Sequence, residues 1–263
     1  MKSRTTRYPD LFPNNNVGFV ISLLNTTYGP LDTLDQSSFI MAETSKIELF
    51  YDTVSPYSWY ALHYLQKNRE ALSSHGINIE LTPVFLGGIM QKSGNTPPWK
   101  NTNKATMGTI DKARAQKYFG LEFGTPDFFP AFTLLPQRSL TYIKDKYPPA
   151  KLEEASVECW KMMWMENKDI TKPELMIECL ARHFDEADIR AIMQAANSPE
   201  YKSKLLASTD RALETGAYGC PWFEVTNHKG VKEPFFGSDR FHYMWEFLEL
   251  PWQDIAIMPK SKI

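Results

Sequence analysis

The stretch YDTVSPYSWYAL, residues 51–62, decides the fold. Alternating apolar residues over 46–53 form a predicted strand that runs into Ser55-Pro56. Serine followed by proline often begins a helix, because the hydroxyl caps free N–H groups and proline suits the first turn. Apolar residues at helical spacing then predict a helix over 58–73, and alternation over 77–85 predicts a second strand. The sequence therefore predicts a strand–helix–strand unit with a right-handed crossover.

The rest of the chain predicts a long helical segment followed by a hairpin. Glycine, asparagine and proline in residues 87–98 favour a loop. The following segment is mostly helical, with helices predicted at 105–119 and 150–167. Strands at 222–226 and 234–236 flank a turn, and a last helix is predicted to begin near Ser238.

This order predicts an α/β fold, namely a thioredoxin-like domain (βαβ…ββα) interrupted by an all-helical insertion domain. The predicted boundaries are 46–100 and 213–263 for the thioredoxin-like domain and 101–212 for the insertion. In thioredoxin-like proteins the first helix begins with two cysteines spaced Cys-x-x-Cys. Here Ser55 and Ser58 occupy both positions. A disulfide oxidoreductase is therefore excluded, because neither serine can exchange a disulfide.

Composition excludes several other classes. The 263 residues carry a net charge of −2, so no basic field favours nucleic acid or an anionic membrane as a partner. No apolar run approaches the roughly 18 residues that span a bilayer. Three cysteines, an odd number without Cys-x-x-Cys, argue against a disulfide framework and favour a reducing compartment. Five histidines without ligand spacing make a metal site improbable.

The two ends of the chain bear on where in the cell the protein is targeted. Residues 1–45 show no sustained period, and a disordered leader is favoured over a secretory signal or a transit peptide. Met41 is an alternative translation start. The ending Ser261-Lys262-Ile263 differs by one conservative change from the Ser-Lys-Leu peroxisomal address, with a frayed basic tail as the alternative. We therefore expect an intracellular protein, peroxisomal or mitochondrial, and cytoplasmic otherwise.

Four segments in order carry a family resemblance from Lys46 to the end of the chain. They are LFYDTVSPYSW at 49–59, GGIMQKSGNTPPW at 87–99, GAYGCPWFEV at 216–225 and FFGSDR at 235–240. In this order and spacing the chain resembles the kappa class of glutathione transferases. It is also similar to the related 2-hydroxychromene-2-carboxylate isomerases and, more distantly, to bacterial disulfide oxidoreductases with a helical insertion.

Ser55 is the candidate catalytic residue. A helix start offers unpaired N–H groups at the positive end of the dipole, which favours an anion. A hydroxyl there can donate a hydrogen bond to a thiolate and lower the pKa of the thiol. The resemblance implies that Ser55 contacts the sulfur of glutathione, with Pro56 and Tyr57 in the same binding site. The alternative is a serine that only caps the helix. No nearby base or Gly-x-Ser-x-Gly elbow supports a serine hydrolase.

The segment GAYGCPW predicts the opposite wall of the site. The resemblance implies a cis peptide bond at Pro221, which leaves the backbone of Cys220 able to pair with an extended peptide. An ordinary trans turn is the alternative. The kappa class usually carries an aliphatic residue at the position of Cys220, so a thiol here could form a mixed disulfide with glutathione. A small apolar residue whose backbone does the binding is the favoured interpretation.

Four further residues complete the expected glutathione site. Ser238 is the predicted N-cap of the last helix, whose N–H groups could take a carboxylate, and Asp239 could pair with the γ-glutamyl ammonium. A capping Ser-Asp without a ligand is the alternative. By resemblance Asn95 hydrogen-bonds the glutathione backbone and Lys104 meets the glycyl carboxylate, although a solvated lysine is the alternative for Lys104.

The function implied is glutathione transfer, in which the thiolate attacks a small electrophile or a peroxide. Glutathione is then a co-substrate, no tightly bound cofactor or metal is expected, and a homodimer is expected because similar proteins are homodimers. Two alternatives stay open. One is a glutathione-dependent isomerase of the 2-hydroxychromene-2-carboxylate type, and the other is a non-catalytic thioredoxin-like binding module.

Overall fold

The computed structural model describes residues 45–253. The predicted leader, Ser45 apart, and the Ser261-Lys262-Ile263 address lie outside this range. Within it, four strands form a sheet in the order β2-β1-β3-β4. The bounds are Lys46–Tyr51 for β1, Asn78–Pro83 for β2, Trp222–Thr226 for β3 and Lys232–Phe236 for β4. β2 runs parallel to β1, whereas β3 is antiparallel to both β1 and β4. The predicted α/β fold is thereby confirmed.

The connection between β1 and β2 contains two helices, although one was predicted. α1 spans Pro56–Lys67 and α2 spans Arg69–Ser74. The break lies at Asn68, whose side-chain amide donates to the Tyr64 carbonyl at 2.8 Å. Such a local side-chain bond competes with the helical ladder and ends α1.

The loop predicted at 87–98 is wrong over its first half, because Leu86–Ser93 form the helix α3. Two distant side chains accept the free N–H groups at its start. The Asp52 carboxylate accepts from Leu86 N–H at 2.8 Å, and the Thr209 hydroxyl accepts from Phe85 N–H at 3.0 Å. These tertiary contacts and the burial of Ile89 outweigh the low helix propensity of the two glycines.

A helical segment separates the two pairs of strands. Its elements are α4 (Thr102–Phe119), α5 (Leu134–Lys146), α6 (Pro149–Trp160), a π-helical turn η2 (Lys161–Met165), α7 (Pro173–Leu180), α8 (Glu186–Asn197) and α9 (Pro199–Glu214). A short 3₁₀ turn η1 (Pro98–Lys100) precedes it, and α10 (Phe241–Phe247) follows β4. The helices predicted at 105–119 and 150–167 are confirmed with different bounds. None of the described helices is both long and apolar enough to cross a membrane.

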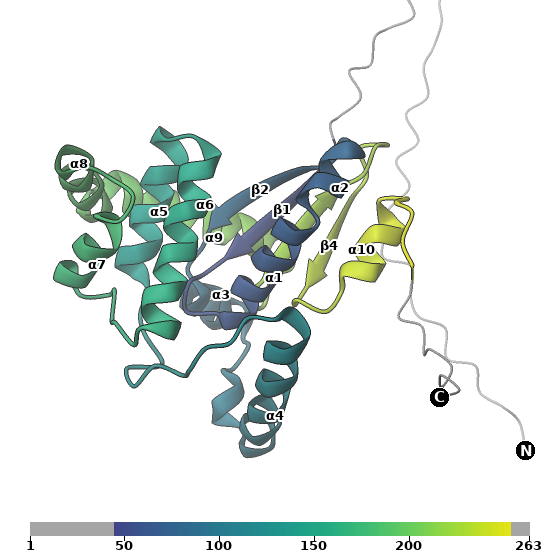
Figure 1. Cartoon of the computed structure of the whole chain (residues 1–263), viewed down its shortest axis with the longest axis horizontal. Coiled ribbons are helices and arrows are strands. Elements are labelled where there is room, and N and C mark those ends of the chain that lie inside the picture. The colour runs from purple at the N-terminus through teal and green to yellow at the C-terminus, as the bar shows by residue number, and fades with distance from the viewer. Residues whose placement is uncertain (1–44, 254–263) are drawn as a thin grey trace, which may run out of the picture. The chain divides into compact units, whose positions relative to one another are not determined.

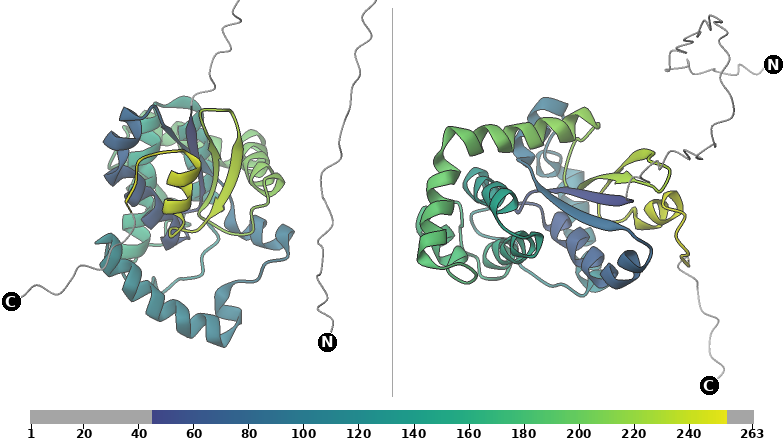
Figure 2. Two further views of the ribbon diagram at one scale, coloured as in Figure 1. Left: turned by 90° about the vertical axis from the view of Figure 1, so that its right-hand side faces the viewer. Right: turned by 90° about the horizontal axis from the view of Figure 1, so that it is seen from above.

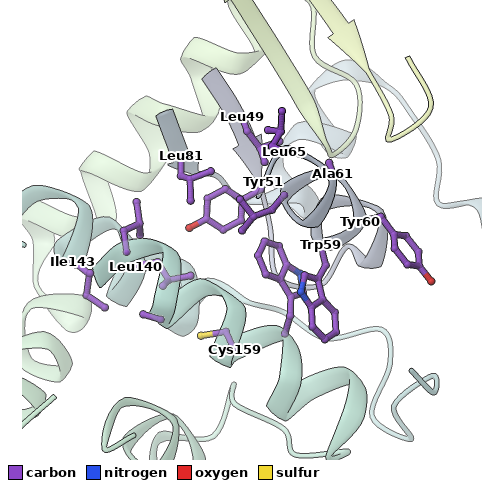
Figure 3. Close-up of a cluster of buried hydrophobic side chains, with 14 of the residues drawn as sticks. Leu49, Tyr51, Trp59, Tyr60, Ala61, Leu65, Leu81, Leu140, Ile143 and Cys159 are labelled. Atoms are coloured by element: carbon purple, nitrogen blue, oxygen red, sulfur yellow. The ribbon is translucent and has the colours of Figure 1, made fainter. Parts of the chain in front are cut away.

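Most of the helical segment packs on the β2 side of the sheet, whereas α4 lies apart from it and contacts α1 (Figure 1). α5, α6 and α9 contact β2, while α7 and α8 lie farther out and β4 and α10 lie at the other end (Figure 1). The view from above in Figure 2 shows α8 and α9 wrapping the outside of α5 and α6. Figure 3 shows the core between these layers, where side chains of β1 and α1 face α5 and α6. Its labelled members include Leu49, Tyr51, Trp59, Leu65, Leu140, Ile143 and Cys159.

Candidate active site

Ser55 stands between the end of β1 and the start of α1. It is the N-cap of α1 in an extended conformation, with Pro56 as the first helical residue. Its Oγ accepts from the Ser58 N–H at 3.2 Å and donates to the Cys220 carbonyl at 3.0 Å. Ser55 is 5% exposed. The hydroxyl is therefore fixed at the helix start with one donor and one acceptor already engaged.

The Cys220–Pro221 bond is cis, as predicted. The Cys220 carbonyl accepts a hydrogen bond from the Ser55 hydroxyl, and the Pro221 carbonyl accepts one from Gly237 N–H at 3.0 Å. Three segments that are distant in the sequence, namely the start of α1, the turn before β3 and the end of β4, are therefore joined by hydrogen bonds.

A cavity of about 1140 Å³ opens beside this junction. Five of the residues predicted from the sequence line it: Tyr57, Cys220, Pro221, Ser238 and Asp239. Aromatic side chains of α1, α4 and α10 form much of its wall, among them Tyr64, Tyr118, Phe119, Phe241 and Trp245. Ser55 is not among the described lining residues, but its hydroxyl is bonded to the carbonyl of Cys220, which is one of them. Charged side chains line the cavity as well, among them Asp111, Arg114 and Arg240, so its lining combines aromatic surface with polar groups that can orient a small molecule.

The prediction that Ser238 caps the last helix is wrong. α10 begins at Phe241 with Arg240 as its N-cap, and Ser238 and Asp239 lie in a turn that follows Gly237. Gly237 has a φ of +88°, and its N–H is bound to the Pro221 carbonyl. This left-handed residue directs the chain into a turn after β4. Asp239 reaches the cavity and pairs with the adjacent Arg240.

Asn95 and Lys104 take other positions. The Asn95 amide donates to the Tyr218 carbonyl at 2.7 Å, so it holds the loop that precedes Cys220-Pro221. Lys104 lies exposed in the first turn of α4, where its backbone N–H donates to the Asn101 side chain. Neither is among the described residues that line the cavity.

Comparison with known proteins places the chain in a family. Residues 46–249 match the family of DSBA-like thioredoxin domains. Over 212 residues the chain is 30% identical to the human protein named glutathione S-transferase kappa 1, covering 78% of this chain and 92% of that protein. The chain belongs to the kappa-class glutathione S-transferase family. Glutathione S-transferase kappa 1 of Caenorhabditis elegans is 27% identical over 216 residues, which cover 80% of this chain and 94% of the relative.

Solved structures share the fold of this kappa-family chain. The structure of a 2-hydroxychromene-2-carboxylate isomerase superposes with a TM-score of 0.62 at 18% sequence identity, covering 78% of this chain and 94% of the isomerase. A cytosolic disulfide reductase DsbM from Pseudomonas aeruginosa gives a TM-score of 0.51 at 16% identity, covering 78% of this chain and 97% of the reductase. At these identities the likeness shows the thioredoxin-like fold with its helical segment.

Sequence reasoning missed Asp52, a fully buried carboxylate three residues before Ser55. It accepts hydrogen bonds from Val54 N–H at 3.0 Å, Leu86 N–H at 2.8 Å and the Thr133 hydroxyl at 2.6 Å. Burial nevertheless raises the pKa of Asp52 to about 6, since the bonds offset only part of the desolvation. An acidic residue directly after an apolar strand was the available signal.

The cysteines of this kappa-family chain are free thiols. Burial, and secondarily the nearby Asp52 carboxylate, raise the pKa of the Cys220 thiol well above its usual value. Cys159 and Cys179 are buried on α6 and α7, with 3.7 Å between their sulfur atoms.

Residues 45–253 contain no group of three or more histidine, cysteine or acidic side chains that could hold a metal ion. The site thus offers a hydrogen-bond donor and a helix start, chemistry that suits a bound anion.

Proposed function

We propose that the protein is a glutathione transferase that ionises the thiol of bound glutathione against Ser55. The observation that carries the proposal is the Ser55 hydroxyl, which caps α1 and lies 3.0 Å from the carbonyl of Cys220 beside a cis proline. A hydroxyl at a helix start favours a thiolate by hydrogen bonding and by the helix dipole.

The bond between Ser55 and Cys220 suggests how the hydroxyl becomes available. In the structure the Ser55 hydroxyl donates to the Cys220 carbonyl. An extended peptide that pairs with the backbone of Cys220 as an added strand can offer its own N–H to that carbonyl. The Ser55 hydroxyl is then free to turn toward the cysteinyl sulfur of the peptide, while its oxygen still accepts from Ser58 N–H.

The rest of glutathione is assigned to the cavity next to Cys220 and Pro221. Asp239 lines this cavity and supplies a carboxylate for the γ-glutamyl ammonium, and Ser238 and Tyr57 line it too. Asn95 acts through the Tyr218 loop that it holds. Lys104 is left out of this assignment, because it does not line the described cavity.

The thiolate then attacks an electrophilic carbon or a peroxide of a small second substrate. The aromatic wall formed by α1, α4 and α10 is the surface against which such a substrate would pack. Glutathione is consumed as a co-substrate, and the chemistry requires no tightly bound cofactor. We expect the protein to act as a homodimer, in an intracellular compartment.

Titration of the thiolate absorbance of bound glutathione tests the proposal. Ser55→Ala removes a hydrogen bond to a charged group, which costs about 1.5–3 kcal/mol, so the thiol pKa should rise by about one to two units. Ser58→Ala is the matched control, since the Ser58 hydroxyl is buried in the first turn of the same helix and has no hydrogen-bond partner among the described residues. A thiol pKa unchanged in Ser55→Ala removes Ser55 from the mechanism. Failure of the parent to bind glutathione favours the non-catalytic binding module instead.

A further inference from the structure

The backbone of residues 51–55 is held by side chains of the helical segment. This segment joins β1 to α1, and three of its carbonyl groups accept hydrogen bonds from side chains in addition to any backbone bonds. Gln137 of α5 donates to the Tyr51 carbonyl at 2.8 Å. Trp164 of η2 donates to the Thr53 carbonyl at 3.0 Å, and Trp160 of α6 donates to the Ser55 carbonyl at 3.2 Å. Alternate carbonyls of the turn are thus each fixed from the helical side.

Two tryptophans on successive helical turns reach the same segment. Trp160 ends α6, and residues 161–165 form η2, which contains Trp164. A π-turn widens the helix and is frequently found at functional sites. Here both indole N–H groups, four residues apart, donate into the turn that ends in Ser55.

Trp160 is the residue whose indole N–H donates to the Ser55 carbonyl. Its side chain is fully buried. Its ring lies 5.2 Å from the ring of Tyr51 and stacks on Trp59 at 6.2 Å. Removing the indole N–H would leave the Ser55 carbonyl with only the first backbone bond of α1, and the Ser55 backbone would lose its constraint from the helical segment.

We infer that Trp160 is a positioning residue for the thiolate step: its indole N–H fixes the Ser55 backbone so that the hydroxyl meets the sulfur of glutathione. The inference rests on the proposed function. Trp160 does not line the described cavity, so it acts on the bound thiol only through Ser55. The helical segment thereby contributes to catalysis without touching glutathione.

The test compares Trp160→Phe with Trp59→Phe in the full chain. Trp59 is buried in the same stack, but its indole N–H makes no hydrogen bond to the described backbone of residues 51–55. Trp160→Phe should raise the pKa of the bound glutathione thiol by about half a unit, which lowers kcat/KM about threefold below that pKa. The glutathione Kd should stay within about twofold, and the rate deficit should disappear at a pH where the thiol is fully ionised. Trp59→Phe should leave the thiol pKa unchanged.

If phenylalanine at position 160 prevents folding, benzothienylalanine incorporated there keeps the ring shape and removes only the N–H donor. The same thiol pKa shift is expected. An unchanged thiol pKa in a folded Trp160 variant, or an equal rate deficit at every pH, overturns the positioning role while leaving the proposed function intact. A parent protein that leaves the thiol of glutathione at its solution pKa overturns both.

Discussion

The substitution Asp52→Asn should change how the stability of the protein depends on pH. Asp52 is fully buried, and burial raises its pKa from 3.8 to about 6. Because the folded-state pKa is the higher one, the folded protein holds this proton more tightly than the unfolded chain does. The contribution of Asp52 to the free energy of unfolding is therefore largest below about pH 4 and falls as the pH rises through about 6.

The size of the effect follows from the shift. Two pKa units correspond to about 3 kcal/mol in total, of which about 2 kcal/mol is lost between pH 4.5 and pH 8. Asparagine stays neutral throughout. Its oxygen can still accept one of the bonds from Val54 or Thr133, but its NH₂ group cannot accept from Leu86 N–H, a loss of about 1–2 kcal/mol at every pH. The variant should therefore be less stable at pH 4.5 and gain about 2 kcal/mol relative to the parent by pH 8.

Urea unfolding followed by tryptophan fluorescence across this pH range measures the difference. Asp111→Asn serves as the control, since Asp111 is only half-buried and its pair with Arg114 lies at the surface. Parallel stability curves for the parent and Asp52→Asn would show that the buried carboxylate does not titrate in this range, and the reasoning from burial would be refuted.

Two further changes test the binding site. Cys220→Ala should keep the glutathione Kd within about threefold, because the carbonyl that Ser55 meets belongs to the backbone. In the parent, the buried Cys220 thiol should react with iodoacetamide far more slowly than free glutathione at neutral pH, since its pKa is raised, and rapid alkylation of Cys220 would contradict this. Gly237→Ala should weaken glutathione binding about tenfold, because it strains a residue at φ +88° and places a Cβ 2.7 Å from Asp239 Oδ1. Gly76→Ala, at φ +70° with no described atom within 4 Å of the added Cβ, should leave binding unchanged, and equal losses in both variants would argue against the Asp239 contact.

Local patterns predicted the strands and most of the helices, because these elements follow their own periodicity. The predicted strand at 46–53 differs from Lys46–Tyr51 only at its end, and the Ser55 cap is present as expected. α3 was missed because its start is completed by Asp52 and Thr209, which lie 34 and 124 residues away. No window of local sequence contains those partners.

The candidate site divides in the same way. The helix cap at Ser55 carries a short local signature and was predicted from it, whereas the cis bond at Pro221 was predicted from the family resemblance. The bond from Asn95 to Tyr218 joins residues 123 positions apart, and the sequence offered only the family resemblance for Asn95. Trp160 lies in the helix predicted at 150–167, but its bond to the Ser55 carbonyl forms only when α6 packs on the turn, so no local pattern indicated its role.

Ser55 and Ser58 stand where thioredoxin-like proteins carry two cysteines, which raises the question of which thiol this site would activate. Burial argues against each of the protein's own thiols. Cys159 and Cys179 lie in the core of the helical segment, and Cys220, the one cysteine among the described lining residues, has a pKa raised well above its usual value. A buried thiol of this kind is a poor source of thiolate. The Ser55 hydroxyl, in contrast, lies at the positive end of a 12-residue helix. It donates to the Cys220 carbonyl, with which an incoming peptide can pair instead. A thiol carried in by the peptide would gain the stabilisation that the thiol of Cys220 lacks, and for that reason we assign the nucleophile to glutathione.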